Sequence, residues 1–116
     1  MKFKKKPVIM EAFQMTRERR FNNRDWPEWL NEAWNKAEGT TGAVWHDPKP
    51  PKEALMVGTL EGVARLELGN WIIRGVIGEL YPCKEDIFNL TYDPILPTDD
   101  VYKSAAADLG GASIYQ

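Results

Sequence analysis

The residues with the clearest potential for chemistry surround a glycine turn in the second half of the chain. Arg74 precedes the turn at residues 75–78, and Glu79 follows it across an expected hairpin. An arginine on an otherwise apolar run needs a partner when it is partly buried. Two interpretations of Arg74 therefore stand: a structural ion pair with Glu79, or a planar clamp for a phosphate or carboxylate group.

Evidence for catalysis is weaker than evidence for binding. Glu79, Glu85 and Asp86 are close in sequence, as acid/base or magnesium chemistry would need, but no second acidic motif accompanies them. The single histidine, His46, and the single cysteine, Cys83, exclude an internal disulfide, a paired-histidine metal site and a Cys/His zinc cluster. We therefore predict no catalytic residues, no metal ligands and no cofactor.

Tryptophan is unusually abundant, with five in 116 residues. Trp26, Trp29 and Trp34 recur at helical spacing within residues 26–38, and the apolar residues of this segment cover about 140° of a helix. Such a stripe usually fills a core, but part of it is also suited to a dimer interface or to stacking on a base. Trp71, Tyr81 and Phe88 carry the same two interpretations, as core residues or as the lining of a pocket.

The elements that must position these side chains follow from local patterns. Asp25 as a cap, Pro27 in the first turn and Glu28 three residues after the cap predict a helix over residues 26–38, which ends at Gly39. Short apolar runs separated by glycine turns predict a meander of strands after a proline-rich loop. The expected strands are 7–15, 43–45, 54–60, 63–68, 71–74 and 79–82, with one helical turn at 84–90 and a returning strand at 91–93 beside the first.

This order predicts an α+β fold, a small, bent antiparallel or mixed β-sheet packed against one tryptophan-rich amphipathic helix. Residues 1–97 are expected to form a single domain. Residues 98–116 are expected to form a tail that packs on this domain or on a neighbouring subunit.

Charge is distributed unevenly although the net charge is only −2. The first 24 residues carry eight Lys or Arg against two Glu, a net charge of +6, so the remainder carries −8. The basic end is either a solvated edge whose lysines discourage aggregation or an anion-binding rim. Without a global basic field, no stable nucleic-acid binding is expected. No targeting or membrane segment is recognised, so we expect an intracellular protein.

Residues 69–88, GNWIIRGVIGELYPCKEDIF, resemble a family of small tailed-phage and prophage proteins related to the PGDYG group. The family pattern is G-D-[WY]-I-I-R-G-V-x-G-E-x-Y-P-C-K-x-D-I-F, and residues 5–14 and 26–30 also look like that family. Asn70 replaces the usual Asp, which keeps the turn geometry but removes a charge, so it is given no catalytic role. The resemblance implies a phage accessory protein rather than a virion component.

Together these observations predict a non-enzymatic phage accessory protein, acting against host defence, that sequesters a small anionic ligand. A nucleotide immune signal in the cytoplasm of the infected bacterial host is the expected ligand, and a homo-oligomer without membrane contact is the expected state. The alternatives are a protein-binding modulator of a host enzyme and a nucleotide-cleaving enzyme that uses Glu79 or Asp86. The candidate ligand-binding residues are Phe13, Gln14, Trp26, Trp34, Trp71, Arg74, Glu79, Tyr81 and Lys84.

Overall fold

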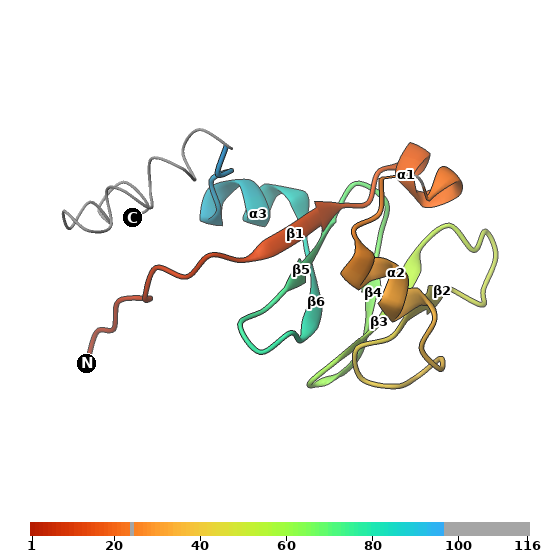
Figure 1. The fold of residues 1–116 in the computed structure, drawn as a ribbon, viewed down its shortest axis with the longest axis horizontal. Coiled ribbons are helices and arrows are strands. Elements are labelled where there is room, and N and C mark those ends of the chain that lie inside the picture. The colour runs from red at the N-terminus through yellow and green to blue at the C-terminus, as the bar shows by residue number, and fades with distance from the viewer. Residues whose placement is uncertain (24, 97–116) are drawn as a thin grey trace.

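The computed structural model describes residues 1–23 and 25–96, and within these ranges it forms two small antiparallel sheets (Figure 1). One sheet has the strand order β1-β5-β6 and the other β2-β3-β4. The expected small α+β fold is thus confirmed, but the strands divide between two sheets instead of forming one. The strands are β1 (Glu11–Gln14), β2 (Val44–His46), β3 (Leu55–Thr59), β4 (Gly62–Leu66), β5 (Trp71–Arg74) and β6 (Leu80–Cys83).

Three short helices accompany the sheets within the described residues. They are α1 (Arg17–Asn22), α2 (Glu28–Trp34) and α3 (Glu85–Thr91). None of the helices in the described part of the chain is long and apolar enough to cross a membrane. The expected tail at residues 98–116 lies outside the described residues.

The main core lies where the first sheet, the second sheet and α2 meet. Phe13 on β1, Ile72 on β5 and Leu80 on β6 share one face of the first sheet. Phe13 is paired with Ile72, and Ile72 with Pro82, which lies two residues from Leu80 and therefore on the same face. They belong to a single buried cluster, which is completed by Met15, Trp26, Leu30, Ala33, Val44, Leu55, Val57 and Leu66.

The other face of the first sheet has its own cover, because α3 lies across it. The rings of Trp71 and Phe88 are stacked with their centroids 4.0 Å apart, and the centroids of the Phe88 and Tyr92 rings are 5.0 Å apart. Ile73 is buried on this face, opposite to its neighbour Ile72. The single helical turn expected at residues 84–90 is therefore a longer helix with a packing role.

The first strand is shorter than predicted and has a different partner. Residues 7–10 are outside β1, although the strand was expected to begin at residue 7, and Val8 and Ile9 are exposed. β1 pairs with β5 and not with residues 91–93, so that part of the prediction was wrong. Thr91 is instead the last residue of α3, which packs on the sheet through the stack of Phe88 on Trp71.

Two helix predictions also require correction. α2 begins after Pro27, which makes no side-chain cap, so Asp25 is not the cap and the helix is shorter than residues 26–38. Trp26 precedes α2, and its indole Nε1 donates to the carbonyl of Arg19 at 2.7 Å. α1 was not predicted because it lacks an apolar stripe, but Thr16 Oγ1 accepts from the Arg19 amide at 3.2 Å and so caps it.

A glycine bulge connects the two sheets and begins β5. Gly69 has φ +92°, its N–H donates to the Met15 carbonyl at 2.7 Å, and Met15 N–H donates to the Asn70 carbonyl at 2.9 Å. This arrangement needs a positive φ at its first residue, which glycine adopts without strain. Asn70 Oδ1 then accepts from the Glu85 amide at 3.1 Å. The turn residue thus satisfies a free N–H at the start of α3 and ties that helix to β5.

We predict that Asn70→Ala lowers the free energy of unfolding by about 1 kcal/mol, because the Glu85 amide at the start of α3 loses its acceptor. Asn70→Asp should retain most of the stability, since a carboxylate can accept the same bond. Urea unfolding followed by tryptophan fluorescence measures the difference. Asn35→Ala, which removes an exposed side-chain amide just after α2, is the matched control and should change stability by less than about 0.5 kcal/mol. Equal stability of the Asn70→Ala and wild-type proteins would contradict this capping role.

Candidate functional site

Arg74 lies at the end of β5, where its neighbours are fixed by the strand register. It stands opposite Glu11 on β1 and Leu80 on β6. Its Nη1 donates to Glu11 Oε1 at 3.2 Å, and both side chains are largely exposed. The predicted pair with Glu79 was wrong, because Leu80 and not Glu79 occupies the position directly across the hairpin.

Glu79 serves the turn itself. Its Oε1 accepts from the Ile77 amide at 3.1 Å, and a Cβ added to Gly75 would lie 2.1 Å from the same oxygen. The carboxylate therefore folds back over the turn, which a side chain at position 75 would obstruct. Glu79 thus shapes the loop that carries Val76 and Ile77. The guanidinium of Arg74 has Glu11 as its one hydrogen-bond partner among the described residues.

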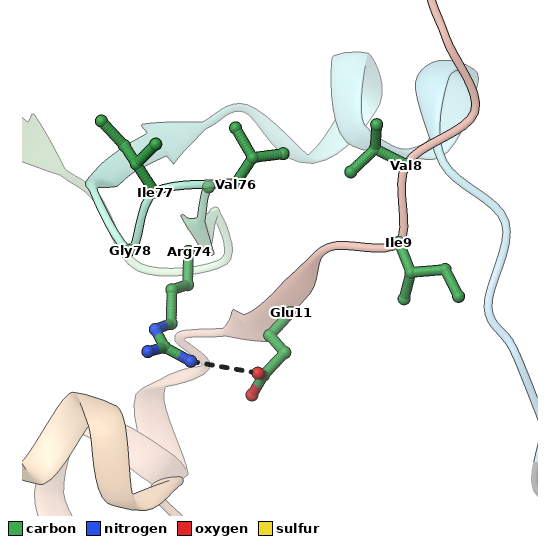
Figure 2. A pocket seen from close by; sticks show the side chains of 8 residues that line it. Val8, Ile9, Glu11, Arg74, Val76, Ile77 and Gly78 are labelled. Carbon is green, nitrogen blue, oxygen red and sulfur yellow. Dashed lines mark hydrogen bonds and ion pairs between the residues drawn. The ribbon is translucent and has the colours of Figure 1, made fainter.

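An open groove runs between the N-terminal segment and this turn, as Figure 2 shows. The exposed aliphatic side chains Val8 and Ile9 lie on one side, and Val76 and Ile77 on the other. The Glu11–Arg74 ion pair lies below these side chains in the view and lines the same groove. The groove encloses about 650 Å³, a size within the usual range of small-ligand sites, although it is open to solvent.

A narrow slot of about 90 Å³ adjoins Arg74 and Gly78 on the side of α2. Its other lining residues include Lys36, Glu32 and the partly buried ring of Trp29. Arg74 and Gly78 line both the slot and the open groove. We call the groove and slot together the Arg74 site. It offers two cations, two carboxylates, one indole and an aliphatic rim.

Most of the predicted aromatic ligands are used in packing. Phe13 and Trp26 are buried, and the guanidinium of Arg19 lies 4.6 Å from the Phe13 ring. Trp34 meets Trp26 edge to face at 5.6 Å, and the guanidinium of Arg20 lies 5.7 Å from its ring. These rings support the core interpretation, and none of them lines the Arg74 site.

The remaining predicted ligands lie on the α3 face of the sheet. Gln14 Nε2 donates to the Gly69 carbonyl at 2.9 Å and to the Glu85 carboxylate. Trp71 is stacked on Phe88, and its Nε1 is buried without a partner among the described residues. Lys84 is exposed at the start of α3, and Tyr81 hydrogen-bonds to Tyr92. Of the nine predicted residues, therefore, Arg74 alone lines the site, with Glu79 supporting its turn.

The arginines of α1 do not form an open anion-binding rim. Arg17 makes a bidentate ion pair with Glu53, which raises the pKa of the guanidinium and lowers the pKa of the carboxyl. Arg19 donates to the Gln14 carbonyl and Arg20 to the Glu53 carbonyl, both at 3.0 Å. Burial lowers the pKa of Arg20. These cations stabilise the loop contacts of α1.

Metal and thiol chemistry find no support in the described residues. No group of three or more His, Cys, Asp or Glu side chains converges there. Burial and the neighbouring Asp86 raise the pKa of Cys83, which keeps the thiol protonated and weakly nucleophilic. His46 is exposed on β2, on the other sheet from Cys83, so the two do not form a nucleophile and base.

Sequence reasoning missed Lys36 and Glu11 as site residues. Lys36 belongs to the polar end of the α2 region, where one more lysine carries no local pattern. Glu11 and Arg74 are 63 residues apart in sequence, and only the pairing of β1 with β5 brings them together. The sequence signal that could have indicated the site is the turn after Arg74, because its glycines add no side chains at that end of β5.

Tyr81 provides a test of the packing under α3. Burial, followed by the hydrogen bond with Tyr92, raises the pKa of the Tyr81 hydroxyl well above its ordinary value of 10.0. The unfolded chain therefore releases this proton at lower pH than the folded protein, so the Tyr81 contribution to stability is complete below pH 10 and is lost as pH rises further.

We predict that the free energy of unfolding falls less steeply between about pH 9 and 11 in Tyr81→Phe than in the wild type, because phenylalanine has no proton to lose. Urea unfolding at several pH values measures the two slopes. A constant offset at neutral pH is expected from the lost hydrogen bond and does not affect the comparison. Parallel slopes would show that Tyr81 ionises alike in the folded and unfolded states.

Comparison of the chain with protein-family models, with curated proteins and with solved structures finds no match. The resemblance of residues 69–88 to phage proteins therefore stays a prediction, and the site must be interpreted from its own geometry.

Proposed function

We propose that this protein is a non-enzymatic binding protein that holds a small anionic ligand of the nucleotide class at the Arg74 site. Together with the resemblance to phage accessory proteins, this supports sequestration of a nucleotide signal in the cytoplasm of an infected bacterium. The observation that carries the proposal is the position of Arg74, whose guanidinium borders both the slot and the open groove.

The donors of the site suit an anion. Arg74 has one hydrogen-bond partner in the described chain, so most of its guanidinium N–H groups are open to a phosphate or carboxylate. Lys36 lines the same slot and supplies a second cation without an ion pair among the described residues. An anion in the slot would contact both cations and displace the exposed Glu11 from Arg74.

The rest of such a ligand would lie in the groove. Val8, Ile9, Val76 and Ile77 offer an apolar surface for its body, and Trp29 offers the one aromatic ring that lines the site. Glu79 is held by the Ile77 amide, and the described acidic residues do not converge with a histidine or metal cluster. These features favour binding without turnover.

Arg74→Ala is predicted to weaken binding of the nucleotide that best raises the melting temperature by at least about tenfold, because charge-assisted hydrogen bonds are lost. A panel of linear and cyclic nucleotides and inorganic phosphate is screened by thermal shift, and affinity is then measured by calorimetry. The ligand released by heating is analysed: intact nucleotide supports sequestration, whereas altered nucleotide supports the enzyme alternative.

Arg17→Ala is the matched control, since it removes an exposed Arg–Glu ion pair far from the groove. It should bind as the wild type does. Lys36→Ala should also weaken binding, by less than Arg74→Ala because a lysine makes no bidentate contact. If no member of the panel binds, or if Arg74→Ala binds normally, an anion site at Arg74 is excluded.

A second function, inhibition or modulation of a host enzyme by direct protein binding, is favoured by the exposed aliphatic rim. Val76 and Ile77 are 66% and 75% exposed at the tip of the β5–β6 turn. Adjacent exposed aliphatic side chains at a protruding turn are typical of a contact surface. The occupant would be an aliphatic segment of the partner that presents a carboxylate to Arg74.

We predict that Ile77→Asp abolishes binding of a partner protein and weakens nucleotide binding by less than Arg74→Ala does, because the aspartate replaces part of the aliphatic rim but leaves the two cations of the slot in place. Pull-down with purified candidate enzymes and calorimetry with the nucleotide measure the two effects. The control Leu60→Asp alters an equally exposed residue after β3 and should leave both unchanged. Normal binding of the partner protein by Ile77→Asp would exclude the turn as its contact surface.

A further inference from the structure

The outer edge of β1 is a second surface with binding capacity, on the side of the strand away from the Arg74 site. In the described chain β1 pairs with β5 on one side and with no strand on the other. An edge strand presents backbone N–H and C=O groups that can pair with another chain. The inference goes beyond the proposed function, and the two surfaces share Val8, which also lines the groove of the Arg74 site.

The hydrogen-bond pattern shows which part of the edge is open. Met15 exchanges its backbone bonds with Gly69 and Asn70, so by alternation Phe13 and Glu11 also face β5, while Ala12 and Gln14 face outward. The Gln14 carbonyl already accepts from the Thr16 amide at 3.1 Å and from Arg19 at 3.0 Å. The open part of the edge therefore begins at Ala12 and runs towards the N-terminus.

Opposite charges lie at the two ends of this edge. Residues 1–10, which we call the N-terminal arm, contain Lys2, Lys4, Lys5 and Lys6 and no acidic residue. None of these lysines forms an ion pair with a described residue, and Lys5 Nζ lies 5.4 Å from the Tyr92 ring centroid. At the other end, Gln14 contacts Glu85, and Asp86 follows it at the start of α3.

We infer that the open edge of β1 pairs with β1 of a second copy of this chain in antiparallel orientation. A two-fold axis makes the contact self-complementary, and it carries the N-terminal arm of each copy towards the Gln14 end of the other. The lysines then approach Glu85 and Asp86, neither of which is in an ion pair with a described residue, while the lysines of the two copies stay at opposite ends. The second copy also covers the exposed Val8.

This arrangement gives the basic arm a role in orientation. Lysines at an edge oppose parallel or shifted pairing, in which arm would meet arm. They favour only the antiparallel register in which each arm meets an acidic helix start. The dimer is therefore expected to weaken as the salt concentration rises, because exposed charge pairs are screened.

Charge reversal tests the interface with the full-length chain by sedimentation velocity over a range of concentrations. The wild type should show a monomer–dimer equilibrium. The variant Lys5→Glu with Lys6→Glu and the variant Glu85→Lys with Asp86→Lys should each weaken dimerisation by about tenfold or more, since like charges then face each other. An equimolar mixture of the two variants should restore the dimer, because every contact then joins opposite charges.

Near-UV circular dichroism establishes that each variant is folded, and Glu85→Gln with Asp86→Asn, which should weaken the dimer less, replaces the lysine variant if it is not. Lys49→Glu with Lys52→Glu is the matched control on a distant loop and should dimerise normally. A monomeric wild type at all concentrations, or a dimer that withstands the edge reversals, would overturn the inference. So would a dimer that assembles from the mixture no better than from either folded variant alone.

Discussion

The structure depends on the burial of β5 on both of its faces. Ile72 is fully buried against the main core and Ile73 is 1% exposed beneath α3, so adjacent residues of one four-residue strand hold two separate apolar layers. A shift of the strand by one residue would exchange these faces, so that Ile73 would replace Ile72 in the main core and Arg74 would move to the face under α3. The register of β5 is thus the constraint that fixes Glu11 and Leu80 beside Arg74 and leaves the guanidinium at the surface.

The two ends of β5 then have different roles because different glycine turns bound them. At one end the bulge at Gly69 places Asn70 where it can accept from the first amide of α3, so this end is tied down by a helix. At the other end the turn at residues 75–78 is held by Glu79, and the slot beside it is lined by Trp29 and Glu32 of α2. The packed end supports the fold, and the opposite end carries the candidate site at Arg74.

Sequence patterns predicted the elements that have a strong local cause. The strand at 71–74 was predicted with its observed bounds, because β-branched residues stand between two glycine turns. α1 was not predicted, because its stability comes from the Thr16 cap and from arginine contacts with residues 52 and 53 and not from an apolar stripe. The partner of Arg74 was predicted wrongly for a related reason: Glu79 is close in sequence, but the strand register selects Glu11.

The same distinction explains why net charge is a poor guide to the candidate site. The first 24 residues are the most basic part of the chain, yet the arginines at 17, 19 and 20 are held by a carboxylate, by carbonyls and by aromatic rings. A cation that already has well-placed partners must lose them before it can bind a ligand, and that cost offsets the gain. Arg74 has a single exposed partner, which water can replace at little cost. An anion should therefore bind more readily at Arg74 than at the arginines of α1, although α1 lies in the more basic part of the chain.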